Sequence, residues 1–284
     1  MNVDVESAYA GRKLAARAAS VACGVAVVLA LVPLVAILVY VGKRGLGALS
    51  FAFFTELPRP VGERGGGMAN AIVGTVELIG LASAVAIPVG IAAGLFLAEY
   101  RTTLLARAAR FSADVLAGVP SILVGVVVYA TVVVRMQHFS TFAGALALAI
   151  LMLPLVARTT DELARTVPES LREAALALGA SRWRIAIHVV LRTAAPGIRA
   201  GCMLAVARVS GETAPLLFTA FNNRFWNESL GDPTSSLQVQ IFTYTMSPYD
   251  DWHAQAWAAA LVLVAIVIVL NLAARRVLRG PRPT

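Results

Sequence analysis

The chain has 284 residues, of which 58% are hydrophobic and only 14% are charged, and its mean hydropathy is +0.76. Soluble domains normally carry about 25% charged residues, so this composition excludes an ordinary soluble protein. The formal net charge is +8 and the pI is near 10.2. Most Lys and Arg residues lie in alternate segments between apolar runs, which indicates a membrane topology and not a nucleic-acid-binding surface.

Six apolar runs follow one another along the chain, each close to the roughly 20 residues that a helix needs to cross a bilayer. Because backbone polar groups in lipid must be satisfied within the spanning segment, we expect an all-α, polytopic membrane protein. The basic excess in alternate loops predicts that both termini are cytoplasmic. The predicted transmembrane helices are 19–41, 72–98, 113–134, 140–157, 194–220 and 255–274.

The first apolar run is too long for the apolar core of a signal peptide and no small-residue cleavage site follows it, so we expect a retained helix. Residues 42–69 and 222–253 are expected to be external loops, the first of them irregular because it is rich in Gly and Pro. Residues 101–110 are expected to be a basic cytoplasmic turn. The predicted organisation is a cytoplasmic tail (1–18), a first transmembrane helix with its external loop (19–69), a transmembrane domain (70–274) that contains a cytoplasmic loop (158–192), and a second cytoplasmic tail (275–284).

The cytoplasmic loop at 158–192 is polar and Arg-rich, with Glu-Ala-Ala-Leu-Ala-Leu-Gly at 173–179. Residues 173–178 favour a helix, and Gly179 suits a left-handed residue that ends it. Ser181 can then cap a second short helix. Small side chains leave a knob slim enough to enter a groove on another protein: Ala174, Ala175, Ala177 and Gly179.

This loop, read together with Pro196-Gly197-Ile198, resembles the EAA coupling loop of ABC-importer permeases. Further stretches resemble the phosphate-specific permeases of the PstA type: 74–100, 114–125, 153–163, 207–221 and 235–244. The most family-specific piece is Gly211–Leu217. The resemblance runs from about residue 70 to the end of the sixth helix.

The resemblance implies a type I ABC-importer permease fold (MetI-like) and a permease subunit of an ATP-driven inorganic phosphate importer in a bacterial inner membrane. It implies a heterodimer with a sister permease, two ATP-binding subunits at the cytoplasmic face and a periplasmic phosphate-binding protein at the external face. The coupling residues would be Glu173, Ala174, Ala175 and Gly179. Arg158, at the inner end of the fourth helix, would be a functional arginine at the cytoplasmic mouth of the pathway, although an ordinary positive-inside anchor explains it equally well.

Two positions depart from the family pattern. Arg192 stands where EAA loops usually have Pro, although Pro196 is kept. Glu77 replaces a residue that is usually apolar near the external end of the second helix, where its side chain can reach outward to water. Because of Glu77, the sequence does not determine which residues line the pathway at its outer end.

Two charges interrupt the fifth apolar run at a spacing that places both on one helix face, Arg208 and Glu212. A charge at mid-bilayer costs at least about 2.5–3.5 kcal/mol, so the pair needs a partner or a purpose. It is either a structural ion pair or the lining of an anion pathway. In the second case the Arg208 guanidinium matches phosphate oxygens, and Glu212 holds it in place or accepts a hydrogen bond from a P–OH group, which sulfate lacks.

No Gly-rich P-loop is present, so ATP must be hydrolysed by a partner subunit. The three histidines are far apart, and there is no Cys cluster or nucleophile motif, so we predict no catalytic residue, metal site or cofactor in this chain. The alternatives left open are a permease for sulfate or molybdate and, from another class, a passive anion channel. A channel has no need of an ATPase-docking loop.

Overall fold

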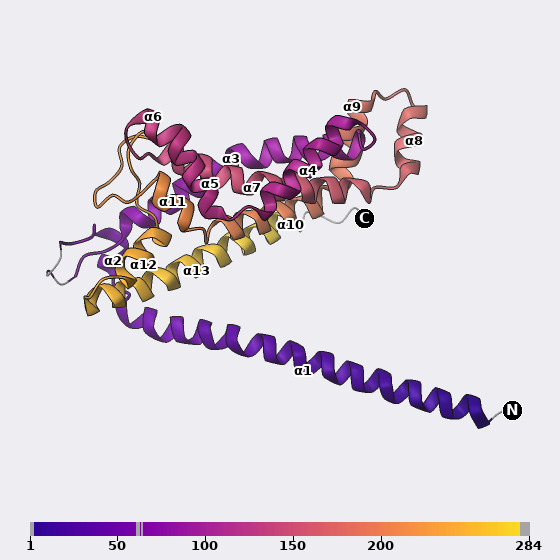
Figure 1. Cartoon of the computed structure of the whole chain (residues 1–284), viewed down its shortest axis with the longest axis horizontal. Coiled ribbons are helices and arrows are strands. Elements are labelled where there is room, and N and C mark those ends of the chain that lie inside the picture. Colours follow the sequence, from indigo (N-terminus) through magenta and orange to yellow (C-terminus); the bar gives the residue numbers. More distant parts are fainter. Residues whose placement is uncertain (1–2, 61–62, 64, 279–284) are drawn as a thin grey trace.

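The computed structural model describes residues 3–60, 63 and 65–278, and this part is built from helices and the loops between them (Figure 1). Two stretches have π-helical hydrogen bonding and are named η1 and η2. The elements are α1 Val3–Ala48, α2 Phe51–Thr55, α3 Ala69–Glu99, α4 Leu104–Gly118, α5 Ser121–Val128, η1 Tyr129–Val133, α6 Val134–Met136, α7 Thr141–Arg165, α8 Glu169–Ala177, α9 Arg182–Arg184, η2 Ile185–Leu191, α10 Arg192–Val209, α11 Ala214–Thr219, α12 Leu237–Thr245 and α13 Asp250–Leu278.

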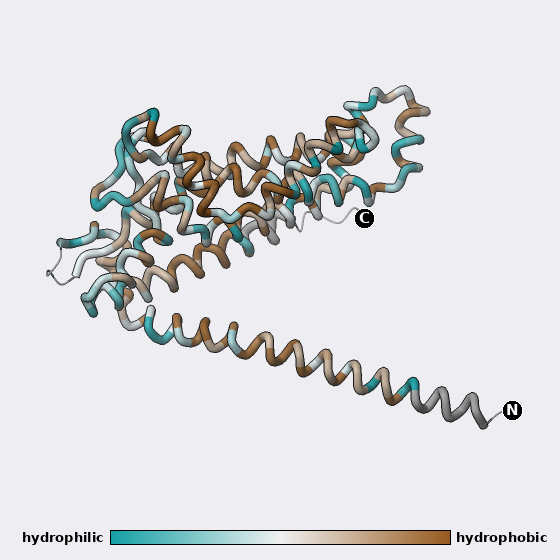
Figure 2. Tube along the Cα trace, viewed as in Figure 1, coloured by the Kyte–Doolittle hydropathy of each residue, from teal (hydrophilic) through white to brown (hydrophobic). Residues whose placement is uncertain are grey.

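The apolar residues lie along the middle of the long helices and the polar residues gather towards the two ends of the molecule (Figure 2). Within the described residues, five helices are long and apolar enough to cross a membrane, and a bent pair of helices would make a sixth span. The expected all-α, polytopic architecture is therefore confirmed.

Helices α3 and α7 form the centre of the main hydrophobic core, where Leu148 and Met152 are fully buried. Their close approach depends on two glycines of α3, spaced by four residues. A Cβ on Gly90 would lie 2.8 Å from Cβ of Val156, and one on Gly94 would lie 2.5 Å from the carbonyl oxygen of Ala157. Small residues at this spacing let the backbones of membrane helices pack directly, which in lipid is a main source of helix association.

The third span is not the straight helix predicted at 113–134. Helix α4 and the continuous run from α5 to α6 meet at an angle of 104°. The break falls at Val119, whose backbone is extended (φ −69°, ψ 132°), because the ring of Pro120 disfavours a helical conformation in the residue before it. Residues 104–110, expected in a basic turn, are the first part of α4.

The fifth span also differs from the prediction of a helix at 194–220. It begins earlier, at Arg182, and continues through η2 and α10 to Val209. It then breaks, and the short α11 restarts at Ala214 with Pro215 in its first turn. Proline has no N–H to donate and its ring clashes with the carbonyl four residues earlier, so the helix cannot run through this position.

The two expected external loops contain helices. Ser236 caps α12, with its hydroxyl oxygen accepting from the Val239 N–H at 3.4 Å, and residues 237–240 are buried. The loop at 42–69 holds α2, whose Phe53 is buried in one cluster with Met68 and Ala71 at the start of α3. In α12 apolar and polar side chains alternate at 237–240, and its buried glutamines find hydrogen-bond partners in the protein.

Helix α1 stands apart from the bundle (Figure 1). Its described contacts with α13 include two near its C-terminal end, where Tyr40 packs edge-on against Trp257 with ring centroids 5.1 Å apart and Gly45 approaches Leu261. The first described residues of α1 lie on the side of the molecule that holds α8. The C-terminal ends of α7 and α13 point to the same side. The predicted tails reach residues 1–2 and 279–284, which lie outside the described residues.

Candidate substrate pathway and coupling surface

The breaks in the third and fifth spans meet at one pocket of about 210 Å³. On one side it is bounded by the turn between α4 and α5, and on the other by the end of α10. Its lining is largely polar even though α7 also contributes two leucines. The pocket residues are Leu116, Ala117, Gly118, Val119, Pro120, Ser121, Leu151, Leu155, Arg208, Val209 and Glu212.

Arg208 and Glu212 both line this pocket, and among the described residues they do not form the ion pair that was one of the two alternatives. Arg208 lies on the last turn of α10, whereas Glu212 lies in the turn beyond the helix end. Among the described residues, neither side chain has a hydrogen-bond or ion-pair partner. The Arg208 side chain is exposed and that of Glu212 is half-buried, so a guanidinium and a carboxylate face one polar cavity without neutralising each other.

The first turn of α5 adds backbone donors to the same pocket. The first backbone bond of this helix runs from the Leu123 N–H to the Pro120 carbonyl at 2.9 Å. The N–H group of Ser121, which lines the pocket, precedes it, and such a group at a helix start has no partner within the helix. A guanidinium beside the N-terminus of a helix is the combination that binds oxyanions.

A buried glutamine holds the broken fifth span in place. Gln238 of α12 donates from Nε2 to the Ser210 carbonyl at 2.5 Å, and its Oε1 accepts from the Thr75 hydroxyl at 3.4 Å. The Thr75 hydroxyl oxygen in turn accepts from the Leu237 N–H at 2.8 Å. The carbonyl freed by the end of α10 is thus satisfied by α12 and tied to α3. The sequence analysis did not identify Gln238, because it used 235–244 only as a family motif. Two glutamines within an apolar run are the signal that could have identified it.

Arg158 is the third residue predicted for the pathway, and the structure places it away from the Arg208 pocket. It lies on α7, exposed, with its Nε 3.0 Å from Glu162 and its Nη1 3.4 Å from Asp114 of α4. It borders a separate cavity of about 130 Å³. Arg158 is therefore held by two carboxylates between α4 and α7, nearer to the end of the molecule that carries α8.

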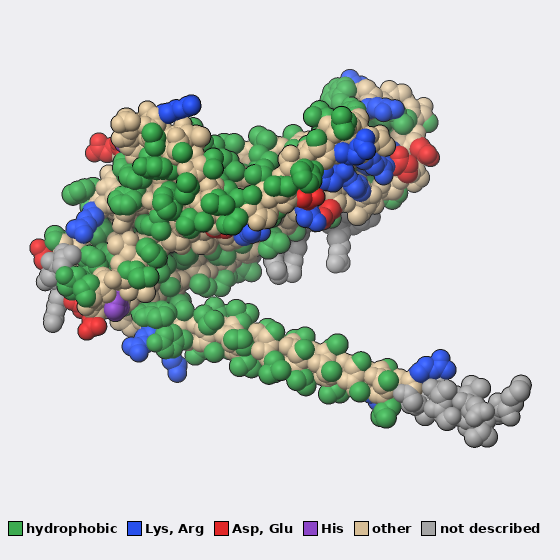
Figure 3. All heavy atoms as spheres, viewed as in Figure 1, with side chains coloured by type: hydrophobic (Ala, Val, Ile, Leu, Met, Phe, Trp, Pro, Cys, Tyr) green, Lys and Arg blue, Asp and Glu red, His purple; other side chains and the backbone are tan. Residues whose placement is uncertain are grey.

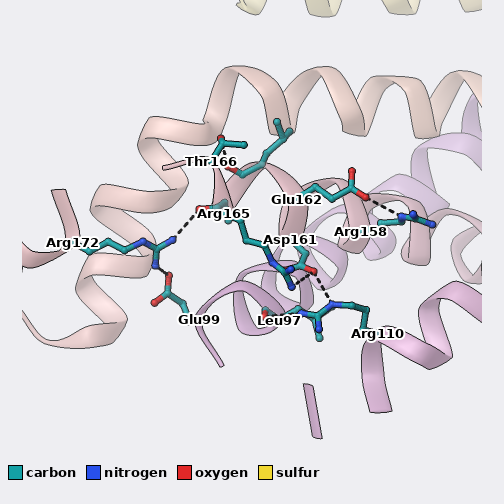
Figure 4. Close-up of polar contacts among 11 residues, drawn as sticks. Leu97, Glu99, Arg110, Arg158, Asp161, Glu162, Arg165, Thr166 and Arg172 are labelled. Atoms are coloured by element: carbon teal, nitrogen blue, oxygen red, sulfur yellow. Dashed lines mark hydrogen bonds and ion pairs between the residues drawn. The ribbon is translucent and has the colours of Figure 1, made fainter. Parts of the chain in front are cut away.

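Close to Arg158, the buried carboxylate of Asp161 takes part in contacts that link three helices (Figure 4). Asp161 of α7 accepts from Nε and Nη2 of Arg165 at 2.8 and 2.9 Å, and from Nε of Arg110 at 3.0 Å. Arg110 of α4 also donates to the Leu97 carbonyl of α3 at 3.1 Å. Since a carboxylate can accept several charge-assisted hydrogen bonds, Asp161 fixes the positions of α3, α4 and α7 at this end.

The predicted coupling helix is observed as α8, and its end has the expected form. Gly179 has φ +80°, its N–H donates to the Leu176 carbonyl at 2.9 Å, and the Ala180 N–H donates to the Ala175 carbonyl at 3.1 Å. This pair of bonds is the Schellman motif, which needs a left-handed residue at Gly179. Ser181 precedes α9 as predicted, but its side chain makes no capping bond.

The surface of α8 is open to a partner. Glu173, Ala174 and Gly179 are exposed and Ala175 is half-buried. Leu178 is 89% exposed, and Leu171 and Leu176 are also largely exposed. Figure 1 shows α8 standing out at one end of the molecule, and exposed apolar side chains there are typical of an interaction surface.

An ion pair that the sequence analysis missed attaches α8 to the spanning helices (Figure 4). The Arg172 guanidinium, 9% exposed, pairs through Nη1 with Glu99 at the end of α3. Its Nη2 also donates to the Ala164 carbonyl at the end of α7, at 2.9 Å. A force on α8 is thus transmitted to both α3 and α7 through one side chain.

We expect Arg172→Met to lower the thermal stability of the detergent-solubilised protein, because it leaves the mostly buried Glu99 carboxylate without its partner, at a cost of about 3 kcal/mol. The matched control is Arg101→Gln, which removes an exposed pair with Glu169 (3.7 Å) and should change stability by no more than about 1 kcal/mol. Equal effects of the two variants would contradict the role given to Arg172.

The comparisons with known proteins agree with this geometry. A family model described as "Binding-protein-dependent transport system inner membrane component" matches residues 90–282. The chain belongs to this family. This permease is 47% identical to the "Phosphate transport system permease protein PstA" of Yersinia pestis over 82% of its own length and 79% of that protein. The same-named protein of Haemophilus influenzae is 44% identical (82% of each chain), and PstA 1 of Mycobacterium tuberculosis H37Rv is 38% identical over 87% of this chain and 82% of that one.

The permease also matches a solved structure of the inward-facing MetNI methionine ABC transporter. The TM-score is 0.62 at 19% sequence identity, over 75% of this chain and 96% of that chain. At this identity the match shows the fold alone, and it confirms the predicted type I importer permease fold. As an inner-membrane component of a binding-protein-dependent system, the protein is a multi-pass, non-catalytic subunit that works with a binding protein and a separate ATPase.

Proposed function

We propose that this protein is the PstA-type permease subunit of an ATP-driven importer of inorganic phosphate. The observation that carries the proposal is the pocket at the two helix breaks, which Arg208, Glu212 and the start of α5 at Ser121 all line. The names of its relatives, phosphate transport system permeases, support the choice of cargo.

The chemistry of the pocket favours phosphate among oxyanions. The Arg208 fork and the helix N-terminus attract the anion, and Glu212 repels one that is fully deprotonated. Phosphate near neutral pH retains a proton, so its P–OH group can donate to the Glu212 carboxylate. Sulfate has no such proton, so Glu212 makes the site selective against it.

The pathway is formed together with a sister permease. Arg208 is exposed at the surface of this single chain, and a charged side chain at the level of the apolar core needs a covering protein. A second permease facing the pocket would close it. Glu173, Ala174, Ala175 and Gly179 then dock on one of two ATP-binding subunits, while a phosphate-binding protein docks at the opposite end.

Both termini and α8 belong to the cytoplasmic side in this proposal. In a variant whose native Cys23 and Cys202 are replaced by Ala, we expect a membrane-impermeant thiol reagent added outside cells to label Ser229→Cys. It should label Leu178→Cys only after permeabilisation. The opposite pattern would reverse the orientation and remove the basis for the coupling surface.

The proposed function is tested with the complete transporter in vesicles. The permease, its sister subunit and the ATPase are reconstituted with phosphate-binding protein, and uptake of labelled phosphate is measured with ATP on the ATPase side. We expect uptake that depends on ATP and on the binding protein and that excess sulfate does not inhibit. Uptake without ATP would indicate a channel, and equal inhibition by sulfate would contradict the selectivity.

A further inference from the structure

We propose that the permease binds one anionic phospholipid in a groove between the end of α3 and the segment formed by α9 and η2. The groove has a volume of about 270 Å³ and is not part of the pathway pocket or of the α8 surface. Its lining residues are Ala92, Leu95, Phe96, Glu99, Tyr100, Arg182, Trp183, Ala186 and Ile187.

The groove is apolar within the span and becomes aromatic and then charged at its end. Along α3, residues four apart face it in the order Ala92, Phe96 and Tyr100, with the two aromatic rings stacked at 5.1 Å. On the other wall, Trp183 and Ile187 are also four apart and are 59% and 47% exposed. Trp and Tyr favour the boundary between lipid and water. The end of the groove at Tyr100 and Trp183 therefore lies at the headgroup level, and the end at Ala92 lies at the level of the acyl chains.

A guanidinium without a partner stands at the charged end. Among the described residues, Arg182 has no hydrogen-bond or ion-pair partner, whereas the neighbouring Glu99 is neutralised by Arg172. Arg182 also borders an adjoining pocket of about 180 Å³, whose other charged residues are Glu99, Arg101, Glu169 and Arg172. Arg184 lies beside it, with its Cζ 5.4 Å from the centre of the Trp183 ring. Figure 3 shows Lys and Arg side chains gathered at this end of the molecule.

This order of surfaces matches a lipid better than a protein. A soluble ATPase can reach only the end near Arg182, not the part at Ala92 within the span. A phospholipid places its acyl chain along Phe96 and Ile187, and its phosphate against Arg182, as basic pockets between membrane helices do with anionic lipids. The π-helical η2 widens the turn that presents Ala186 and Ile187, a local distortion frequent at functional sites. The inference does not depend on phosphate being the transported anion.

The test uses the complete transporter in nanodiscs of phosphatidylcholine doped with phosphatidylglycerol that carries a photoreactive group in its acyl chain. We expect crosslinks to concentrate on peptides that contain Phe96 and Ile187. Arg182→Gln should reduce them by roughly tenfold, since it removes a hydrogen bond to a charged group. Ala186→Trp should abolish them by filling the groove without changing the charge.

Arg107→Gln is the matched control, because Arg107 is an exposed arginine on α4 at the same end of the molecule but outside the groove. It should leave the crosslinks unchanged, as should excess inorganic phosphate, which distinguishes a lipid headgroup from free anion. Crosslinks that are absent from both peptides, or that neither groove variant reduces, would overturn the proposal. So would protein crosslinks from position 183 to the ATPase or the sister permease, since those would show that a subunit covers the groove.

Discussion

Replacing Arg208 by Gln is expected to abolish phosphate uptake while the transporter still assembles. Arg208 carries the positive charge of the pocket at the two helix breaks, and its side chain is exposed and makes no ion pair with Glu212. Its removal therefore leaves no buried carboxylate unpaired, and the subunit should fold. Uptake in vesicles and the yield of intact complex, measured side by side, check both halves of this expectation.

The other variants at this pocket separate a transport role from a structural one. Arg208→Lys should retain only part of the uptake, because an ammonium keeps the charge but not the planar fork that matches phosphate. Glu212→Gln should keep uptake but weaken the discrimination against sulfate. The double variant Arg208→Gln, Glu212→Gln should remain inactive. Full transport by this double variant would mean that the two residues form only a structural pair in the assembled transporter.

The number, order and type of the spanning elements could be predicted from the sequence, because apolar length and charge asymmetry are local properties of the chain. The breaks could not be placed from those properties. Residues 113–134, and residues 194–220 despite the charges within them, are apolar enough to suggest straight helices. Two prolines decide the outcome, Pro120 through the extended residue before it and Pro215 through its missing N–H.

The candidate site, too, was predicted only in part, because some of its features are local in sequence and others are not. Arg208 and Glu212 were found because charges in an apolar run are conspicuous, but they do not share one helix face as their spacing suggests, since the helix ends between them. The long-range partners carry no local signal. The Glu99–Arg172 pair joins residues 73 positions apart, and Gln238 reaches Ser210 over 28 positions. Only the packing of α3, α7 and α12 brings these groups together.

Gly179→Val is expected to uncouple the ATPase from the permease while the pathway pocket stays intact. Gly179 has φ +80°, a left-handed conformation that a β-branched residue adopts only at a cost of about 1–3 kcal/mol. No atom lies within 4 Å of the position of a new Cβ, so the effect is one of backbone conformation and not of a clash. The end of α8 should unwind and displace Leu178 and Ala175 from the surface that we propose docks on the ATPase.

The size of the substituent and its effect on the backbone can be separated at this position. Asn tolerates the left-handed conformation far better than Val, so Gly179→Asn should retain most of the binding-protein-stimulated ATP hydrolysis, although its side chain is no smaller. Gly179→Val should lose most of it, and copurification of the ATPase should weaken in parallel. If the two variants lost activity equally, the absence of a side chain at position 179 would matter, and not the left-handed backbone conformation. If Val were as active as Gly, α8 would not be the coupling element, and the anchoring of Arg172 to Glu99 would serve stability alone.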